Sequence, residues 1–269
     1  MDHNPVNWGR PRNDIYGEYD NRIHNASFND NPMMTGAAPN AHTQSPIVTG
    51  TSVIAIKFDK GVILAADNLA SYGSLARFTD QERLLPVGKD TVIGIGGDIS
   101  DLQYLQRVLE QLEINENYDN DGNSLKSSNV FQYLSNLFYN RRSKMDPLWN
   151  AVLVGGVENG KPFLSYVDLK GVTYSSPVIC TGFGAYLATP LLRKLVDKEG
   201  DELNVTEEQA RKAIDECMKV LFYRDARSLD KYSVATITEG NVRIDTDVHC
   251  ENQSWRFAGS IRGYGTQRD

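Results

Sequence analysis

The chain has 269 residues, of which 40% are hydrophobic, and its 28 basic and 35 acidic side chains give a net charge of −7. This length and composition suit one sizeable hydrophobic core. The acidic balance argues against nucleic acid or an anionic membrane as the main partner. No stretch approaches the roughly 18 to 20 apolar residues of a membrane span. From the charge and this lack of a span, we expect neither a nucleic-acid nor a membrane partner.

The first segment that the sequence separates is a polar leader. Residues 1–42 are rich in Asn, Pro, Gly and Asp and lack hydrophobic periodicity, which predicts a disordered leader or propeptide. Order is expected from near Pro46. An alternating strand is predicted from Thr51 to Phe58, and after a tight turn the apolar run at 62–66 predicts a strand that is buried on both faces.

Further strands and two pairs of helices are predicted in the rest of the chain. A polar loop is expected over 67–80 and another over 115–128. Helix starts are expected at two capping boxes, Ser100-x-x-Gln103 and Thr206-x-x-Gln209. Another helix, carrying Val130 to Phe138, is expected after the first of these, and another, from about Ala185, is expected before the second. The remaining strands are expected at 84–87, 91–95, 150–157, 163–169, 178–181, 232–238 and 242–245.

The order of these elements is strands, two helices, strands, two helices, strands. Antiparallel hairpins interleaved with helix pairs favour two sheets that stack face to face with the helices outside. A doubly wound parallel fold would instead alternate single strands with single helices. We therefore predict an α+β fold, a four-layer αββα sandwich of two antiparallel sheets flanked by helices.

Cysteine and histidine are too scarce to build several common kinds of site. The three cysteines, Cys180, Cys217 and Cys250, are far apart and odd in number, which fits a reducing compartment without a disulfide framework. Three of the four histidines lie in the leader and the fourth is His249, so no pair has metal-ligand spacing. The pattern argues against a Ser-His-Asp triad and a metal centre, and we expect no cofactor.

A different kind of nucleophile is suggested by Gly50-Thr51, which precedes the first predicted strand. A threonine hydroxyl is a poor nucleophile at neutral pH, but a cut before the threonine frees its own α-amine, whose pKa of about 8 suits a base. A glycine turn such as that at Gly97 offers a backbone N–H for an oxyanion hole. Taken singly, these features are ordinary structural residues.

Together with the run YRDARS, the segments GTSVIAIKFDKGVILAADNLAS and VIGIGGDISD resemble the proteasome β-subunit family. The resemblance covers nearly the whole chain from Pro46 to about Asp245. It implies the N-terminal-nucleophile hydrolase fold and a β-subunit domain over 43–246. The stretches SYGSLARF, RRSKMDPLWNAV and TGFGAYLATPLLRK resemble a non-catalytic subgroup, called β7 in yeast and β4 in vertebrates.

The resemblance assigns catalytic positions to five residues of this chain. Thr51 matches the nucleophile of active members, and Asp67 matches the aspartate after the second strand. Gly97 matches the oxyanion-hole glycine. Asp225 and Ser228 match the aspartate and serine near the nucleophile.

Departures from the family pattern occur at the same site. Active members carry a lysine where this chain has Arg83, whose guanidinium keeps its proton and is larger and planar. Phe183 replaces a serine in the turn that supports the nucleophile, and Leu229 and Asp230 replace two glycines. These changes together predict a vestigial catalytic site, so we expect Thr51 to serve as the first residue of a strand.

The expected function is therefore that of a non-catalytic structural β-subunit of the proteasome core, not an enzyme itself, in ATP- and ubiquitin-dependent protein degradation. One alternative is an active threonine endopeptidase subunit that releases Thr51 by self-processing. Another is an unrelated α/β binding module. The resemblance implies that a neighbouring active subunit instead cuts the leader between His42 and Thr43, and that the protein works in cytoplasm and nucleus.

The tail at 247–269 predicts an interface with other subunits. Aromatic and Arg side chains anchor many protein interfaces, and this tail contains Trp255, Phe257, Ile261 and Tyr264 without regular periodicity. The resemblance implies that such an extension reaches subunits of the opposite β-ring. It also implies α- and β-type partner subunits in stacked seven-membered rings.

Overall fold

The computed structural model describes residues 44–119 and 124–260. The predicted leader at 1–42, the cleavage residues His42 and Thr43, and the tail residues Ile261 and Tyr264 lie outside these ranges.

Within the described residues, eight strands form one antiparallel sheet in the order β10-β9-β8-β7-β1-β4-β5, with β6 paired to β7 as well. Strands β6 and β1 share one side of β7, because β6 pairs with its first half and β1 with its end. The bounds are β1 Val48–Gly50, β4 Ala70–Tyr72, β5 Leu75–Phe78, β6 Leu84–Val87, β7 Thr91–Asp98, β8 Asn150–Glu158, β9 Lys161–Asp168 and β10 Thr173–Ser175.

The other described strands form a second antiparallel sheet in the order β11-β2-β3-β12-β13. All seven residues of β3 are buried, as the apolar run at 62–66 predicts. The bounds are β2 Val53–Phe58, β3 Gly61–Asp67, β11 Val178–Cys180, β12 Lys231–Thr238 and β13 Asn241–His249.

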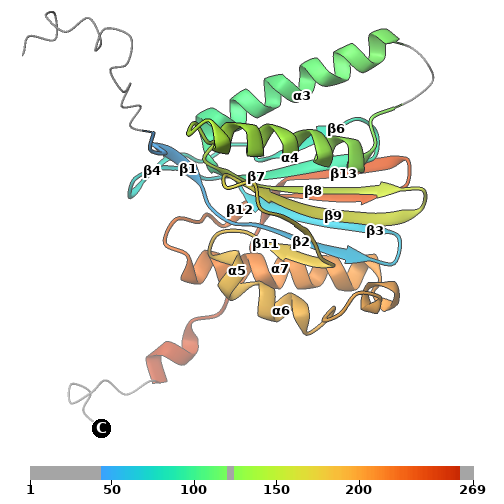
Figure 1. Cartoon of the computed structure of the whole chain (residues 1–269). Helices are drawn as coiled ribbons and strands as arrows, with labels where there is room; N and C mark the ends of the chain where they lie inside the picture. The colour runs from blue at the N-terminus through green and yellow to red at the C-terminus, as the bar shows by residue number, and fades with distance from the viewer. Residues whose placement is uncertain (1–43, 120–123, 261–269) are drawn as a thin grey trace, which may run out of the picture. The chain divides into compact units, whose positions relative to one another are not determined.

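Helices cover the outer face of each sheet (Figure 1). Helices α3 (Ile99–Asp119) and α4 (Ser127–Ser143) lie on the first sheet. Helices α5 (Gly184–Leu187), α6 (Thr189–Arg193) and α7 (Glu207–Arg224) lie on the second, and short 3₁₀ helices occupy Asp201–Asn204 and Arg256–Ser260. The predicted four-layer αββα sandwich is confirmed.

Three apolar clusters hold the four layers together. One joins α3 and α4 to the first sheet, one fills the space between the sheets, and one joins the second sheet to α5, α6 and α7. Burial of this apolar surface is the main stabilising contribution. Representative members are Ile95, Leu105 and Phe138 in the first cluster, Val53, Leu64 and Leu153 in the second, and Ile54, Leu192 and Ile214 in the third.

Of the two predicted capping boxes, only the one that opens α7 is confirmed. Thr206 Oγ1 accepts from the Gln209 N–H at 3.3 Å, and Gln209 Oε1 accepts from the Thr206 N–H at 3.0 Å. The box predicted at Ser100 is wrong, because α3 begins at Ile99. Asp98 caps this helix instead, and its Oδ2 accepts from the Asp101 N–H at 3.1 Å.

Several predicted loops and boundaries are wrong as well. The loop expected at 67–80 contains the hairpin β4–β5, and the sequence analysis missed the three-residue strands β1 and β10, which are too short to show periodicity. Helix α3 continues to Asp119, into the loop predicted at 115–128, helped by an i,i+4 hydrogen bond from Gln111 to Asn115. Strand β13 runs to His249, four residues beyond the predicted end of the last strand at Asp245.

The position expected for Thr51 is also wrong, because Thr51 is not the first residue of a strand. It lies between β1, which belongs to the first sheet, and β2, which belongs to the second. Thr49 pairs with Asp98 and Gly50 with Gly97, which holds the chain in the first sheet up to Gly50. Thr51 therefore lies where the chain crosses between the two sheets.

Candidate functional site

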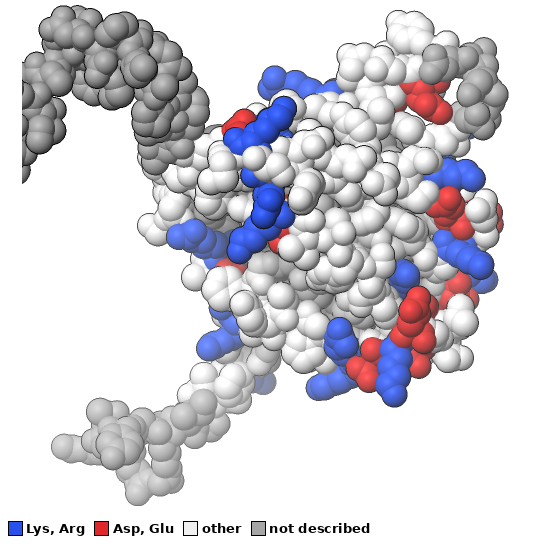
Figure 2. Space-filling view, viewed as in Figure 1, with Lys and Arg blue, Asp and Glu red and all other residues white. Residues whose placement is uncertain are grey.

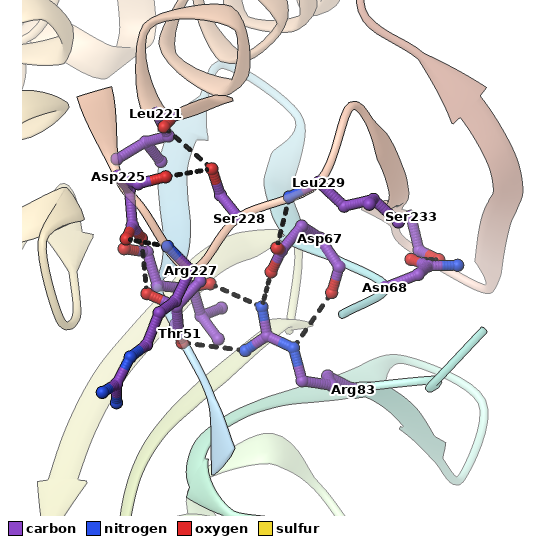
Figure 3. A network of polar contacts seen from close by, with 12 residues as sticks. Thr51, Asp67, Asn68, Arg83, Leu221, Asp225, Arg227, Ser228, Leu229 and Ser233 are labelled. Atoms are coloured by element: carbon purple, nitrogen blue, oxygen red, sulfur yellow. Dashed lines mark hydrogen bonds and ion pairs between the residues drawn. The ribbon is translucent and has the colours of Figure 1, made fainter. Parts of the chain in front are cut away.

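The crossing at Thr51 brings together the five residues to which the family resemblance assigns catalytic positions. The Thr51 hydroxyl donates to Asp225 Oδ2 at 2.6 Å, across a sequence separation of 174 residues. Asp225 follows α7, and its Oδ1 accepts from the Arg227 N–H at 2.9 Å. Ser228 lies in the same turn, but its hydroxyl lies 2.7 Å from the Asp225 carbonyl and 3.0 Å from the Leu221 carbonyl. Ser228 thus holds the turn rather than the Thr51 hydroxyl (Figure 3).

Arg83 lies directly behind Thr51 and is one of the most buried side chains in the described protein, with 1% exposure. Its guanidinium forms a salt bridge with Asp67, which is 2% exposed. It also donates to four backbone carbonyls, those of Asp67 at 3.0 Å, Thr51 at 2.9 Å, Ser52 at 2.9 Å and Ile95 at 3.3 Å.

Asp67 joins this group at the end of β3. One carboxylate oxygen accepts from Arg83, and the other accepts from the Leu229 N–H at 3.0 Å. Burial raises the pKa of Asp67, and the charge and hydrogen bond of Arg83 oppose this rise. Arg83 and Asp67 thus form a buried pair that links β3, β6 and the turn after α7, as Figure 3 shows.

Gly50 has a role at this site that the sequence did not reveal. A Cβ atom at Gly50 would lie 2.5 Å from Arg83 Cδ, so only glycine leaves room for the arginine there. The sequence pattern marks Gly50 only as the residue before a possible cleavage site. The contact with Arg83 became visible only from the fold.

Two hydroxyls that the sequence analysis also missed hold the crossing. Ser52 Oγ accepts from the Gly184 N–H at 2.8 Å, and Thr181 Oγ1 accepts from the Val53 N–H at 2.9 Å. Each partner is about 130 residues away in the sequence. No local motif marks such residues, so the sequence alone does not identify them.

A cleft of about 390 Å³ opens beside Thr51. Gly97, the predicted oxyanion-hole residue, lines it together with Thr51 and Asp225. Gly97 has φ +95°, a region that favours glycine, and a Cβ there would collide with the Trp149 carbonyl. The other residues along this cleft include Asn150, Tyr166, Asp168, Gly182 and Arg227.

The remaining predicted departures lie around this group. Phe183 lines the cleft and its side chain is largely exposed, so it narrows the opening without filling the core. Leu229 contributes its backbone N–H to Asp67, a contact that does not depend on its side chain. Asp230 lies further away, and its carboxylate is 3.6 Å from His249 Nδ1.

Trp255 and Phe257 lie together beyond β13, away from the cleft. The Trp255 ring packs edge-on against Tyr223 at 5.4 Å between centroids, and Phe257 lies 5.8 Å from Trp255. The Gln253 N–H donates to the Tyr223 hydroxyl at 3.1 Å. These contacts attach the start of the tail to the end of α7, while both aromatic side chains stay about half exposed.

The described ranges offer neither a metal-binding cluster nor a membrane-spanning helix. Residues 44–119 and 124–260 contain no group of three or more His, Cys, Asp or Glu arranged to hold a metal ion. None of the helices there combines the length and apolar character needed to span a membrane.

Comparison with known proteins identifies the family. A family model described as "Proteasome subunit" matches residues 47–237. The chain belongs to the proteasome subunit family. Among its relatives, "Proteasome subunit beta type-7" of Saccharomyces cerevisiae is 52% identical over 274 aligned residues that cover all of both chains.

Two other relatives agree on the subtype of this proteasome subunit. "Probable proteasome subunit beta type-7" of Schizosaccharomyces pombe is 50% identical and covers 97% of this chain and 96% of its own. "Proteasome subunit beta type-4" of Xenopus laevis is 48% identical over 85% of this chain and 93% of its own. The chain is thus a β-type subunit of the proteasome core, and its resemblance to the β7 type of yeast and the β4 type of vertebrates is confirmed.

Proposed function

We propose that this chain is a non-catalytic, structural β-subunit that supports assembly of the β-rings for protein degradation. One observation carries the proposal: Arg83, in the position of the catalytic lysine of active members, is buried with its donors directed at fixed acceptors. A guanidinium does not release its proton near neutral pH. Arg83 therefore cannot pass a proton between Thr51 and a substrate.

The chain before Thr51 supports the same proposal. β1 ends at Gly50 and pairs with β4 on one side and with β7 on the other. A cut between Gly50 and Thr51 would leave β1 joined to the sheet by only a few backbone hydrogen bonds. Self-processing would thus cut the connection between the two sheets next to the residues that Arg83 binds, Thr51 and Ser52.

The alternative, an active endopeptidase subunit that uses Thr51, has its own support. The Thr51 hydroxyl donates to Asp225, whose carboxylate is placed to accept the proton, and both residues line a cleft. The free α-amine that serves as base in active members is still absent while Gly50 is attached. The two functions therefore differ in whether Thr51 becomes an N-terminus.

The test is the N-terminus of this subunit in the assembled particle. Intact mass and end sequencing should show a chain that starts upstream of Thr51, and particles with Thr51→Ala should keep every peptidase activity of the wild type. A chain that starts at Thr51, together with an activity lost in Thr51→Ala, would overturn the proposal.

The same measurement tests the proposed removal of the leader. We propose that a neighbouring active subunit cuts between His42 and Thr43, so that the mature chain begins at Thr43. An uncut chain, or a first residue elsewhere, would contradict this site. The partners that we propose are α- and β-type subunits in stacked seven-membered rings. The proposed location is cytoplasm and nucleus, which fluorescence of a tagged chain can check.

The tail is proposed to contact subunits of the opposite β-ring. Its start is held at Tyr223, while Trp255 and Phe257 stay 55% and 48% exposed. Deletion of residues 252–269 should weaken the pairing of half-particles. Normal sedimentation of the resulting particles would count against this role.

A further inference from the structure

The end of α4 has a feature that the proposed function does not explain. Met145 follows the helix with φ +56°, in the left-handed region that side chains other than Gly and Asn seldom adopt. Its N–H donates to the Arg142 carbonyl at 3.1 Å, and the Asp146 N–H donates to the Arg141 carbonyl at 3.0 Å. This is a Schellman motif with methionine at the position that usually holds glycine.

The Met145 side chain contributes little to the packing of this subunit. Met145 is 87% exposed, the most exposed of the large hydrophobic residues that the structure describes. A strained backbone normally persists where the surroundings or a function require it. Here packing within the subunit does not require a large apolar side chain, since a glycine would make the same two hydrogen bonds.

Three basic side chains, Arg141, Arg142 and Lys144, precede the exposed methionine, and one acidic side chain, Asp146, follows it. The Arg142 guanidinium lies 5.6 Å from the ring centroid of Tyr139, and Arg141 pairs with Asp146 at 3.2 Å. Arg142 and Lys144 form no ion pair with any carboxylate in the described ranges. In Figure 2, Lys and Arg side chains gather at the upper left of the body, over the end of α4.

We propose that Met145 is a docking residue that inserts into an apolar hollow, rimmed by carboxylates, on another β-type proteasome subunit. Methionine is flexible and polarizable, so it fills irregular apolar hollows well. Arg142 and Lys144, which both precede Met145 in the chain, select a partner of opposite charge and steer its approach. The inference rests on the proposed function, because it requires that the chain is built into a ring of subunits.

The test is competition between tagged variants and the untagged wild-type chain for entry into the particle. Met145→Gly should lower the share of variant in the particle fraction by about tenfold, because burial of a methionine side chain accounts for that much in a binding equilibrium. The free Met145→Gly chain should melt at the same temperature or about 1–4 °C higher, because glycine relieves the strain. Lower entry without lower stability is the signature of a docking residue.

Two further variants separate shape from charge. Arg142→Glu combined with Lys144→Glu should also lower entry, more strongly at low ionic strength, because salt screens the repulsion. Tyr118→Ala is the matched control, because Tyr118 is 82% exposed and lies in the last turn of α3. This variant should enter the particle as well as the wild-type chain does.

A photoreactive methionine analogue at position 145 should form a cross-link to a β-type subunit at an acid-rimmed surface. Equal entry of Met145→Gly and wild type, or a cross-link only to α-type subunits, would overturn the inference and leave the proposed function intact. If the wild-type chain never entered the particle, the proposed function would fall and this inference with it.

Discussion

Loss of the Arg83 guanidinium should destabilise the protein more than loss of any exposed charge. Arg83→Met keeps much of the bulk but leaves the Asp67 carboxylate buried without its cation. Removal of one partner from a buried ion pair costs about 3–5 kcal/mol. The carbonyls of Thr51 and Ser52 also lose their donor, so this range is a lower bound.

For a chain of this size, that cost corresponds to a fall in Tm of about 6–20 °C. Urea unfolding of the full chain, followed by tryptophan fluorescence, measures the free energy of unfolding directly. The double variant Arg83→Met with Asp67→Asn should recover part of the loss, because it removes the buried charge together with its partner. Arg243→Met is the exposed control, and its surface ion pairs contribute less than about 1 kcal/mol.

A free energy of unfolding for Arg83→Met within about 1 kcal/mol of the wild-type value would contradict a buried ion pair here, since an average substitution costs about that much. A double variant that is less stable than Arg83→Met alone would contradict it as well. In that case Asp67 would not be a buried charge that depends on Arg83.

Three other predictions concern a cap, a glycine and the thiols. Thr206→Ala should lower the free energy of unfolding by about 1 kcal/mol, measured in urea, because it removes the N-cap of α7; an unchanged midpoint would contradict this. Gly97→Ala should cost about 2 kcal/mol or more, since it combines left-handed strain with a collision at the Trp149 carbonyl, and wild-type thermal stability would show that this turn can relax. Burial raises the pKa of Cys180 and Cys250 to about 11 and that of Cys217 to about 12. The unfolded chain therefore releases these protons at lower pH than the folded one, so the free energy of unfolding should fall as pH rises from about 9 to about 12. Rapid alkylation of the folded chain at pH 8 would argue against such protected thiols.

Sequence reasoning predicted the fold well where apolar patterns are long. Strand β3 is buried along its whole length, and its apolar run at 62–66 could hardly belong to a surface loop. Strands β1 and β10 have three residues each, which is too few for an alternating pattern. The hairpin β4–β5 was missed because all four side chains of β5 are exposed, so its pairing follows from backbone contacts with β4 rather than from burial.

The family resemblance named several residues of the candidate site, but it did not predict the contacts between them. Thr51, Asp67 and Asp225 came from the family resemblance, and the structure places them around one sheet crossing. The role of Gly50 could not be predicted, because it depends on how the Arg83 side chain crosses the sheet. The same holds for Ser52 and Thr181, since which hydroxyl meets which N–H is decided only when distant segments pack.

The long separations in this site have a consequence for folding. The Thr51–Asp225 and Asp67–Leu229 hydrogen bonds join residues 174 and 162 positions apart. Contacts of such high sequence separation are slow to form. During synthesis, Arg83 and Asp67 leave the ribosome long before Leu229 does, so the buried pair stays incompletely satisfied until α7 and the turn after it have been made. The sheet crossing at Thr51 thus reports that nearly the whole chain has folded.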